Sequence, residues 1–394
     1  MIEKIRMAIF APHVVQYHAP LYKELNKSYL VEPIVYFYDH QGSVLLLDTQ
    51  FNQIIKWDIP LLEGYQYRFL KNYSPIPLKS NLFSRINFGV IRIIFNRPDI
   101  VLIHGYNIFS NWLVLIFCRL LTVPVIFKGE ATLSAIEFAN TYSIKKKLKK
   151  LIVKFFTDHS SAVLYSCTGN KEYFQHYGVS EKKLFPLSCA VDNDYFQNQK
   201  NILIKQKMII KKEIGILEDE FVVCFLAQLS NRKRPMDLLK TIKELANKYI
   251  KLLIIGDGKI KKELEEYALK NNLNAEFVGF KNQSEISRYL IISDLYVIIS
   301  EQDNSPKSLN EVMNFSLPVI CTNVIGTAKD LVKDGVNGFL IEVGDIEKLK
   351  EKILFIKNNP IIAKEMGEKS LEIVSKFNFR ENRISLEKVV EEII

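Results

Sequence analysis

The chain has 394 residues, enough for two domains of ordinary size, and its 48% apolar and 25% charged residues exclude a disordered protein. The net charge of +9 is concentrated in residues 1–210, which hold 25 Lys and Arg against 15 Asp and Glu, whereas residues 211–394 hold 28 against 29. A basic half could face nucleic acid, an anionic membrane or an acidic acceptor. No nucleic-acid-binding motif accompanies it, so we expect no nucleic-acid partner.

The sequence also predicts the compartment. Its cysteines form no CxxC pair and lie mostly within apolar runs, which is typical of buried thiols in a reducing environment. The first residues lack the apolar core of a signal peptide, and the apolar stretch 112–127 is interrupted by Arg119 and Pro124. We therefore expect a protein that is cytoplasmic or peripheral on the inner face of the cell membrane.

Apolar runs of strand length alternate with helical patterns along the chain, which is typical of βαβ units and parallel sheets. In the first half we predict strands at residues 7–11, 33–37, 100–103, 124–127 and 162–165. In the second half we predict them at residues 221–226, 251–255, 275–278, 295–299, 318–321 and 338–341. Two such sets predict an α/β protein with two doubly wound domains. The polar stretch 193–212 is the predicted hinge, and residues 378–394 read as a final helix.

Three loops of the first half follow predicted strands, at residues 13–20, 104–107 and 128–131. Ligands of open parallel sheets bind beyond the carboxyl ends of the strands, so polar side chains in these loops are candidates for a binding wall. The candidates are Gln16, His18, His104 and Glu130. Glu130 has the chemistry to orient a hydroxyl or to act as a base. A single histidine is equally well explained by a structural role, so both interpretations of the histidines stay open.

Residues 143–156 predict a basic amphipathic helix. Five apolar residues have the spacing of one side of a helix, and the six lysines fall outside that apolar stripe. The stripe is formed by Leu148, Leu151, Ile152, Phe155 and Phe156. The favoured interpretation is that the stripe packs on the sheet and the lysines face water. The alternative is that this helix contacts an anionic membrane.

A short acidic motif, Asp192-Asn193-Asp194, resembles a metal-binding DxD, but it stands at the start of the predicted hinge. We expect it to cap a helix or to serve the hinge. No other group of His, Cys, Asp or Glu has the spacing of metal ligands, so we predict no metal.

The second half holds the most informative pattern. After the predicted strand at 295–299 comes a loop with Asp303, then a helix expected to begin near Lys307 that carries Glu311. Unpaired N–H groups and the dipole at a helix start favour phosphate, and flanking carboxylates suit sugar and ribose hydroxyls. An earlier strand is followed by a basic loop with Arg232 and Lys233. Together these residues predict a pocket for a nucleotide sugar.

Residues 303–320 resemble the donor-site signature of family-4 retaining glycosyltransferases, which have the GT-B fold. That signature usually reads Glu, seven residues, Glu, then Ala-Met-Ala-x-Gly-x-Pro-Val. Here Asp303 stands where the first Glu is usual, and Ser316 where the Gly is usual. The turn at 325–327, the stretch 334–340 and the pair Gly344-Asp345 also match the family, and the resemblance is strongest from residue 222 to residue 345.

The resemblance implies two Rossmann-like domains facing across a cleft. Residues 1–200 would bind the acceptor, residues 201–375 would bind the nucleotide-sugar donor, and the helix 376–394 would pack back on the first domain. Gly256 ends a strand in a Gly-Asp-Gly turn that is not the GxGxxG of a dinucleotide fold, which argues against a nicotinamide enzyme.

Roles follow from the same resemblance. The donor-binding residues would be Arg232, Lys233, Gly256, Gly279, Phe280, Asp303, Asn304, Ser305, Pro306, Lys307, Ser308 and Glu311. Arg232 and Lys233 would hold the diphosphate, Glu311 the ribose and Asp303 the sugar. The catalytic candidates are His104, Glu130 and Asp303, and the acceptor-binding candidates are Gln16, His18, His104 and Glu130.

The expected function is retaining transfer of a sugar from a UDP- or GDP-linked donor to a hydroxyl of a glycan or lipid-linked glycan. The pathway expected is cell-envelope polysaccharide biosynthesis, such as lipopolysaccharide, without cofactor or metal. Two alternatives remain. A nucleotide-sugar epimerase would need histidines around the sugar, and the second half has none. A GT-B scaffold that binds without catalysis is suggested by Asp303 and by Ala227 and Gln228, which stand where a Gly and a cation are usual.

Overall fold

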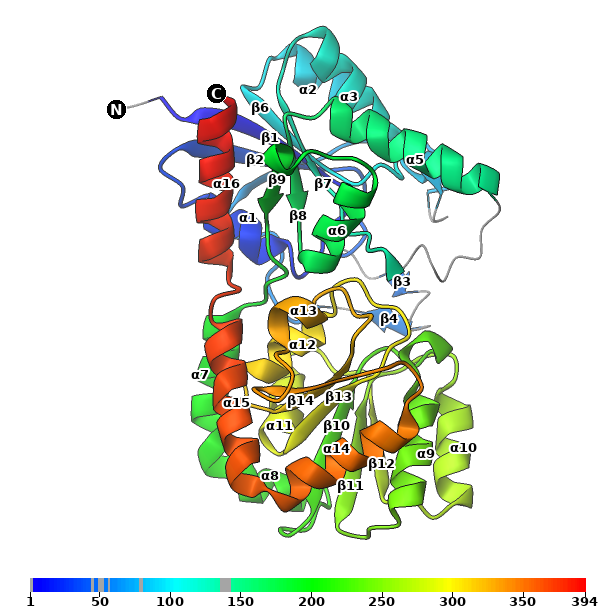
Figure 1. The fold of residues 1–394 in the computed structure, drawn as a ribbon. Helices are drawn as coiled ribbons and strands as arrows, with labels where there is room; N and C mark the ends of the chain where they lie inside the picture. Colours follow the sequence, from blue (N-terminus) through cyan, green and yellow to red (C-terminus); the bar gives the residue numbers. More distant parts are fainter. Residues whose placement is uncertain (1–2, 44–45, 49–52, 56, 78–80, 135–142) are drawn as a thin grey trace. The chain divides into compact units, whose positions relative to one another are not determined.

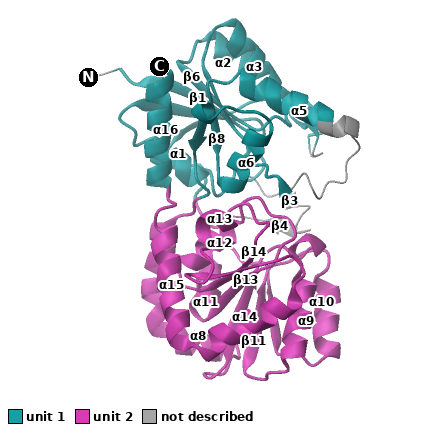
Figure 2. Cartoon of the chain, in the orientation of Figure 1, with its two compact units in different colours: residues 1–46, 60–189, 379–394 teal, residues 47–59, 190–378 magenta. Residues whose placement is uncertain are grey.

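The computed structural model describes residues 3–43, 46–48, 53–55, 57–77, 81–134 and 143–394. The chain divides into two compact units (Figure 2). Unit 1 comprises residues 1–46, 60–189 and 379–394, and unit 2 comprises residues 47–59 and 190–378. The domain boundary expected from the sequence lies about ten residues later in the chain. The short excursion at residues 47–59 has no counterpart in the sequence-based division.

Unit 1 is built on a seven-stranded parallel sheet with the order β5-β2-β1-β6-β7-β8-β9 (Figure 1). Its strands are β1 (Ile5–Ala11), β2 (Val31–Phe37), β5 (Gln66–Phe69), β6 (Ile100–His104), β7 (Val125–Lys128), β8 (Ala162–Tyr165) and β9 (Leu184–Pro186). The strand order reverses between β1 and β6, and at such a point the loops on either side diverge and leave room for a ligand.

The helices of unit 1 cover both faces of this sheet. They are α1 (Ala19–Leu25), α2 (Gly89–Phe95), α3 (Phe109–Leu120), α5 (Ser143–Asp158), α6 (Thr168–His176) and α16 (Phe379–Ile393). α2, α3, α5 and α6 share one apolar core with β1, β6, β7 and β8. α16 packs with α1 and β9, and its Arg383 forms an ion pair with Glu24 at 3.2 Å. The final helix therefore belongs to unit 1.

Unit 2 contains a six-stranded parallel sheet with the order β12-β11-β10-β13-β14-β15. Its strands are β10 (Phe221–Leu226), β11 (Ile250–Ile255), β12 (Ala275–Gly279), β13 (Leu295–Ile298), β14 (Val319–Thr322) and β15 (Gly338–Ile341). Here the order reverses between β10 and β13. A two-stranded ribbon of β3 (Leu46–Asp48) and β4 (Gln53–Ile55) lies at the excursion.

The helices of unit 2 also form two layers. They are α7 (Asn193–Leu203), α8 (Lys207–Glu213), α9 (Pro235–Leu245), α10 (Lys261–Lys270), α11 (Gln283–Ile291), α12 (Lys307–Met313), α13 (Ala328–Leu331), α14 (Ile346–Asn358) and α15 (Pro360–Val374). α9, α10 and α14 share a core with the sheet, whereas α12 packs with α15 and α11 with α7. Four short 3₁₀ turns complete the described elements: η1 (Leu82–Ser84), η2 (Glu181–Lys183), η3 (Ile204–Gln206) and η4 (Asn231–Lys233).

Every strand predicted from the sequence is present, because long β-branched runs buried on both faces give a strong signal. The prediction missed β5 and β9, which are short edge strands with polar residues or a proline, and it also missed the three-residue strands β3 and β4. It was also wrong about the hinge: much of residues 193–212 forms α7 and α8. Polar helices of this kind pack one narrow apolar stripe, here including Phe196 and Ile210, and are easily mistaken for linkers.

Candidate functional site

In unit 2, two loops meet where the strand order reverses. The loop after β10 ends in η4, and the loop after β13 leads to α12. Lys233 Nζ forms an ion pair with Asp303 Oδ2. Arg232 Nη1 donates to the carbonyl of Gln302 at 2.6 Å, and the Glu301 amide donates back to the carbonyl of Arg232 at 3.0 Å. The structure thus brings together Arg232, Lys233 and Asp303, which the sequence predicted for one donor site.

The Lys233–Asp303 pair lies in a poorly solvated place, since each residue is less than a tenth exposed. Burial lowers the pKa of Lys233, and the Asp303 carboxylate opposes that shift. A buried ion pair gains little net stability, because the cost of removing both charges from water offsets their attraction. Its presence at a loop junction is therefore more readily explained by function than by stability.

Arg234 supports the neighbouring lysine. Its backbone has a φ of 54°, in the left-handed region, where a glycine is usual. The guanidinium is held by Asp237 at 2.5 Å and Glu301 at 3.4 Å. These contacts fix the turn between η4 and α9, and so fix the direction in which Lys233 leaves the backbone.

α12 begins at Lys307, as the sequence predicted, and Pro306 before it supplies no side-chain cap. Behind its first turn, the buried Tyr296 hydroxyl lies 2.8 Å from Ser308 Oγ and 3.3 Å from the carbonyl of Leu226. Glu311 is buried one turn into the helix, and Asn304, Ser305 and Lys307 are half-buried. The helix start is therefore tied to the end of β10.

The turn at residues 325–327 closes on the same loop, since the Gly326 amide donates to the carbonyl of Asp303 at 2.9 Å. Two hydroxyls missed by sequence reasoning lie on the two segments that meet here, Ser300 Oγ and Thr327 Oγ1. Both are buried and have no hydrogen-bond partner among the residues that the structure describes. A buried hydroxyl without a partner is costly, so both are candidates for contact with a ligand.

The glycines after β11 allow a close approach of two loops. A Cβ on Gly256 would lie 1.9 Å from the carbonyl oxygen of Ala227, and one on Gly258 would lie 2.2 Å from that of Leu229. The Gly256 amide donates to the carbonyl of Gly279 at the end of β12 at 2.9 Å. Gly256 and Gly279 are thus joined at one edge of the sheet, with Phe280 following.

The excursion at residues 47–59 reaches the same edge of unit 2. The Trp57 ring lies 6.3 Å from that of Phe280, edge to face. The Asp58 carboxylate accepts from the Ser284 amide at 3.0 Å and also from the Ser284 hydroxyl. Sequence reasoning missed this contact, because a segment from the first half of the chain gives no sign that it joins the second sheet.

In unit 1, the predicted acceptor residues gather at the ends of β6 and β7. The His18 and His104 rings lie 5.0 Å apart, and Tyr22 Oη is 3.4 Å from His104 Nε2. His18 Nε2 is 3.7 Å from Glu130 Oε1. Gln16 lies in the loop after β1, and its buried Oε1 has no hydrogen-bond partner in the described part of the chain.

Lys128, the last residue of β7, completes this cluster and was not predicted. Its Nζ lies 3.1 Å from His18 Nε2 and 2.9 Å from Glu130 Oε1, and the residue is buried. A lysine ending an otherwise apolar strand is the signal that could have identified it. Burial lowers the pKa of His104 well below its ordinary value, and the positive charge of Lys128 acts in the same direction. His104 is therefore neutral at pH 7.

Asp192 caps α7: its side chain accepts from the Tyr195 amide at 3.0 Å, which is the capping role expected of it. Within the described residues, no group of three or more His, Cys, Asp or Glu is arranged to hold a metal ion.

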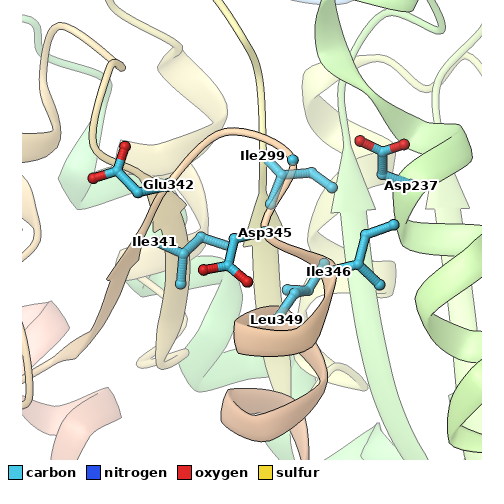
Figure 3. Close-up of a pocket in the computed structure, with 8 residues that line it drawn as sticks. Asp237, Ile299, Ile341, Glu342, Asp345, Ile346 and Leu349 are labelled. Atoms are coloured by element: carbon cyan, nitrogen blue, oxygen red, sulfur yellow. The ribbon is translucent and has the colours of Figure 1, made fainter.

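A small pocket with room for about one water molecule lies in unit 2, at the ends of β13 and β15 beside the first turns of α9 and α14 (Figure 3). Its carboxylates have partners: Asp237 binds Arg234, Glu342 accepts from Asn323 at 2.5 Å and Asp345 caps α14. None of the predicted donor residues lines it, and it is smaller than an ordinary ligand pocket. We do not assign it to the nucleotide.

Residues 206–372 match the model of the family Glycosyl transferases group 1. An uncharacterized glycosyltransferase of Methanocaldococcus jannaschii is 30% identical over 254 residues, 64% of this chain and 71% of its own. N-acetyl-alpha-D-glucosaminyl L-malate synthase of Bacillus anthracis is 29% identical, over 44% of this chain and 46% of its own, so the match spans about half that relative. UDP-Gal:alpha-D-GlcNAc-diphosphoundecaprenol alpha-1,3-galactosyltransferase of Escherichia coli is 23% identical, over 66% of this chain and 67% of its own.

Solved structures share the fold. A glycosyltransferase from Rickettsia africae has a TM-score of 0.75 and 16% identity, covering 99% of this chain and 98% of its own. Anabaena HepE, solved in complex with UDP, has a TM-score of 0.74 and 16% identity, covering 99% of this chain and 100% of its own. Two parallel-sheet α/β units of this kind define the GT-B class of glycosyltransferase. The chain belongs to the Glycosyl transferases group 1 family.

Proposed function

We propose that this protein transfers a sugar from a nucleotide diphosphate donor to a hydroxyl of a glycan or lipid-linked glycan, with retention of the anomeric configuration. The observation that carries the proposal is the junction of Arg232, Lys233 and Asp303 at the strand-order reversal of unit 2. Ligands of open parallel sheets bind at such a point. A cation placed there can bind the diphosphate of a nucleotide sugar, and a carboxylate can bind the hydroxyls of its sugar.

On the donor side, Lys233 and Arg232 stabilise the diphosphate as negative charge develops on it. A preorganised cation in a place of low dielectric lowers the barrier without reorganising during the reaction. Asp303 accepts hydrogen bonds from the sugar hydroxyls, and Glu311 accepts them from the ribose. These cations supply the positive charge that the leaving group needs, so we propose that transfer requires no metal.

In unit 1, His18, His104, Lys128 and Glu130 present donors and acceptors to the hydroxyls of the acceptor. In the front-face route, the bond from the anomeric carbon to the diphosphate oxygen breaks while the acceptor oxygen bonds to that carbon. The acceptor proton passes to the leaving phosphate, so no strong protein base is required. The neutral His104 imidazole both donates and accepts hydrogen bonds, which suits a sugar hydroxyl.

Two similarities suggest where to look for substrates. Anabaena HepE was solved with UDP, and the Escherichia coli relative uses UDP-Gal and an acceptor linked to diphosphoundecaprenol. We propose a UDP-sugar as the first donor to test, ahead of GDP-sugars. We also propose a lipid-linked acceptor of cell-envelope polysaccharide synthesis, handled at the inner face of the membrane. None of the helices in the described part of the chain combines the length and apolar character that crossing a bilayer requires.

The test is incubation of the purified chain with UDP-, GDP- and dTDP-sugars and chelator, following release of the nucleoside diphosphate. We expect slow hydrolysis of one donor, reduced about 100-fold or more by Lys233→Ala. The control is Lys262→Ala, which removes an exposed lysine whose side chain is 89% accessible. Release from no donor would favour the non-catalytic scaffold suggested by Ala227 and Gln228, and conversion of the sugar without release would favour an epimerase.

A further inference from the structure

Three neighbouring helices of unit 1, α2, α3 and α5, form one layer on its sheet (Figure 1). α2 and α3 pack together, with the Phe95 and Phe117 rings 6.1 Å apart. α3 and α5 are joined by Trp112, which stacks on Phe155 at 5.4 Å. The outer sides of the three helices therefore make one continuous surface, which we call the outer helical face.

This outer helical face is apolar where water is expected. Each helix buries one stripe in the core, and the residues opposite that stripe are large and apolar: Phe88 and Phe95 flank α2, Ile116 and Leu120 lie on α3, and Leu148 and Leu151 lie on α5. Leu120 is 70% exposed, Leu148 57% and Leu151 65%. Large exposed hydrophobics gathered on adjacent helices indicate an interaction surface rather than ordinary surface composition.

The structure corrects the sequence-based interpretation of α5 here. Part of the predicted stripe packs on the core as expected, since Phe156 is buried and Ile152 and Phe155 are partly buried. Leu148 and Leu151 point away from the core. The apolar stripe of α5 is thus wider than the part that the core covers, and a helix that only covers a sheet does not need its exposed edge.

The charge of the face is almost entirely positive. α2 and α3 contribute Arg92 and Arg119 and no acid. On α5, Lys147, Lys150 and Lys154 are exposed, whereas the Lys149 ammonium lies over the Tyr173 ring, and the helix has a single acid, Asp158. Asp158 is paired with Lys154 at 2.8 Å. Apolar side chains within a basic surround complement an anionic lipid bilayer, in which acyl chains lie beneath negative headgroups.

We propose that the outer helical face docks the protein on the surface of an anionic membrane, with its exposed apolar side chains in the headgroup region and its lysines and arginines on the lipid phosphates. This deepens the proposed function, since a lipid-linked acceptor is presented at that surface, and its use to the enzyme rests on that function. Docking itself is independent of turnover.

The test is sedimentation of the full-length protein with vesicles of phosphatidylcholine alone or mixed with phosphatidylglycerol. We expect binding to the anionic vesicles, weakened by salt, and little binding to phosphatidylcholine. Leu148→Ser with Leu151→Ser should reduce the affinity about tenfold or more, and so should Lys147→Gln with Lys150→Gln. Leu120→Ser should weaken it as well, since the face extends onto α3.

Matched controls lie in unit 2. Leu269 and Ile361 are 79% and 74% exposed, and changing both to Ser should leave vesicle binding unchanged. Lys262→Gln with Lys364→Gln serves the same purpose for charge, as both side chains are at least 80% accessible.

Several outcomes would overturn the proposal. They are equal binding to both vesicle types, no binding to either, or face variants that bind like the controls. A mass in solution that falls from dimer to monomer in the leucine variant, without vesicle binding, would assign the face to a second copy of the chain. Donor hydrolysis without vesicle binding would reject docking but not the proposed function. Vesicle binding without donor hydrolysis would reject the proposed function but not docking.

Discussion

At the scale of single residues, the candidate site is formed by side chains at the carboxyl ends of the strands. Lys233 and Asp303 are 70 positions apart in the sequence and meet in one ion pair. The sequence indicated both, because each stands in a pattern with a chemical meaning. Lys128 was missed, since nothing before it in its strand is polar, and its importance depends on the distance to His18, which only the fold determines.

The Asp303 carboxylate is predicted to be needed for stability as well as for the sugar. Asp303→Asn removes the counter-ion of a buried ammonium, so it should lower the free energy of unfolding by about 3 kcal/mol. Asp303→Glu keeps the charge and should cost about 1 kcal/mol by adding a methylene. Urea denaturation of both variants checks this.

The control is Glu266→Gln, which breaks the exposed pair of Glu266 with Lys262 and should change stability by less than about 1 kcal/mol. If Asp303→Asn were as mild as Glu266→Gln, the pair would not be buried as described.

His104 gives a pH dependence with a defined sign. Burial lowers its pKa in the folded protein, so below about pH 6.5 the unfolded chain binds a proton that the folded chain does not. The stability contributed by this residue is therefore complete above pH 6.5 and falls as the pH drops. The groups around His104 are Lys128, His18, Glu130 and Tyr22.

The measurement is urea unfolding of the wild type and His104→Gln at pH 7.5 and pH 5.0. The stability of the wild type relative to the variant should fall by up to about 2 kcal/mol at the lower pH. A difference that stays constant or grows would show that His104 takes a proton in the folded state.

At the scale of elements, glycines allow backbones to meet. Gly367 lies inside α15, and a Cβ there would stand 2.0 Å from the carbonyl oxygen of Ser316. Ser316 itself has a φ of 57°, which explains why the family usually has a glycine there, and its hydroxyl accepts from Lys200 at 2.5 Å. The sequence showed the unusual serine, but the partner backbone becomes visible only in the packed helix.

Gly367→Ala is therefore predicted to destabilise the protein although alanine favours helices. The intrinsic gain is about 1 kcal/mol, and overpacking against backbone should exceed it, for a net loss of about 1–3 kcal/mol. Thermal or urea unfolding measures the change. Lys364→Ala, at an exposed position of the same helix, is the control and should be within about 0.5 kcal/mol of the wild type. A stabilised Gly367→Ala protein would mean that α15 does not pack this closely on Ser316.

At the scale of the molecule, the sequence indicated the fold class because parallel strands buried on both faces produce long apolar runs at regular intervals. The assignment of segments to units was harder. Residues 47–59 precede most of unit 1 in the sequence yet belong to unit 2, held there by Trp57 and Asp58. Contacts of this kind leave no periodicity, so they could not be predicted.

The amphipathic helix at 143–156 shows the same limit. Its spacing predicted a helix, and α5 is one, but spacing alone did not reveal that the core covers only part of the apolar stripe. Which part of the stripe is buried depends on Trp112 and the neighbouring strands, which lie elsewhere in the sequence.

The most direct measurement is calorimetric titration of the wild type with UDP and GDP, repeated on Lys233→Ala and the control Lys262→Ala. We expect one site per chain for at least one nucleotide, with affinity lowered about tenfold or more in Lys233→Ala and unchanged in the control. Binding that is absent for both nucleotides, or that is equally tight without the Lys233 ammonium, would contradict this expectation.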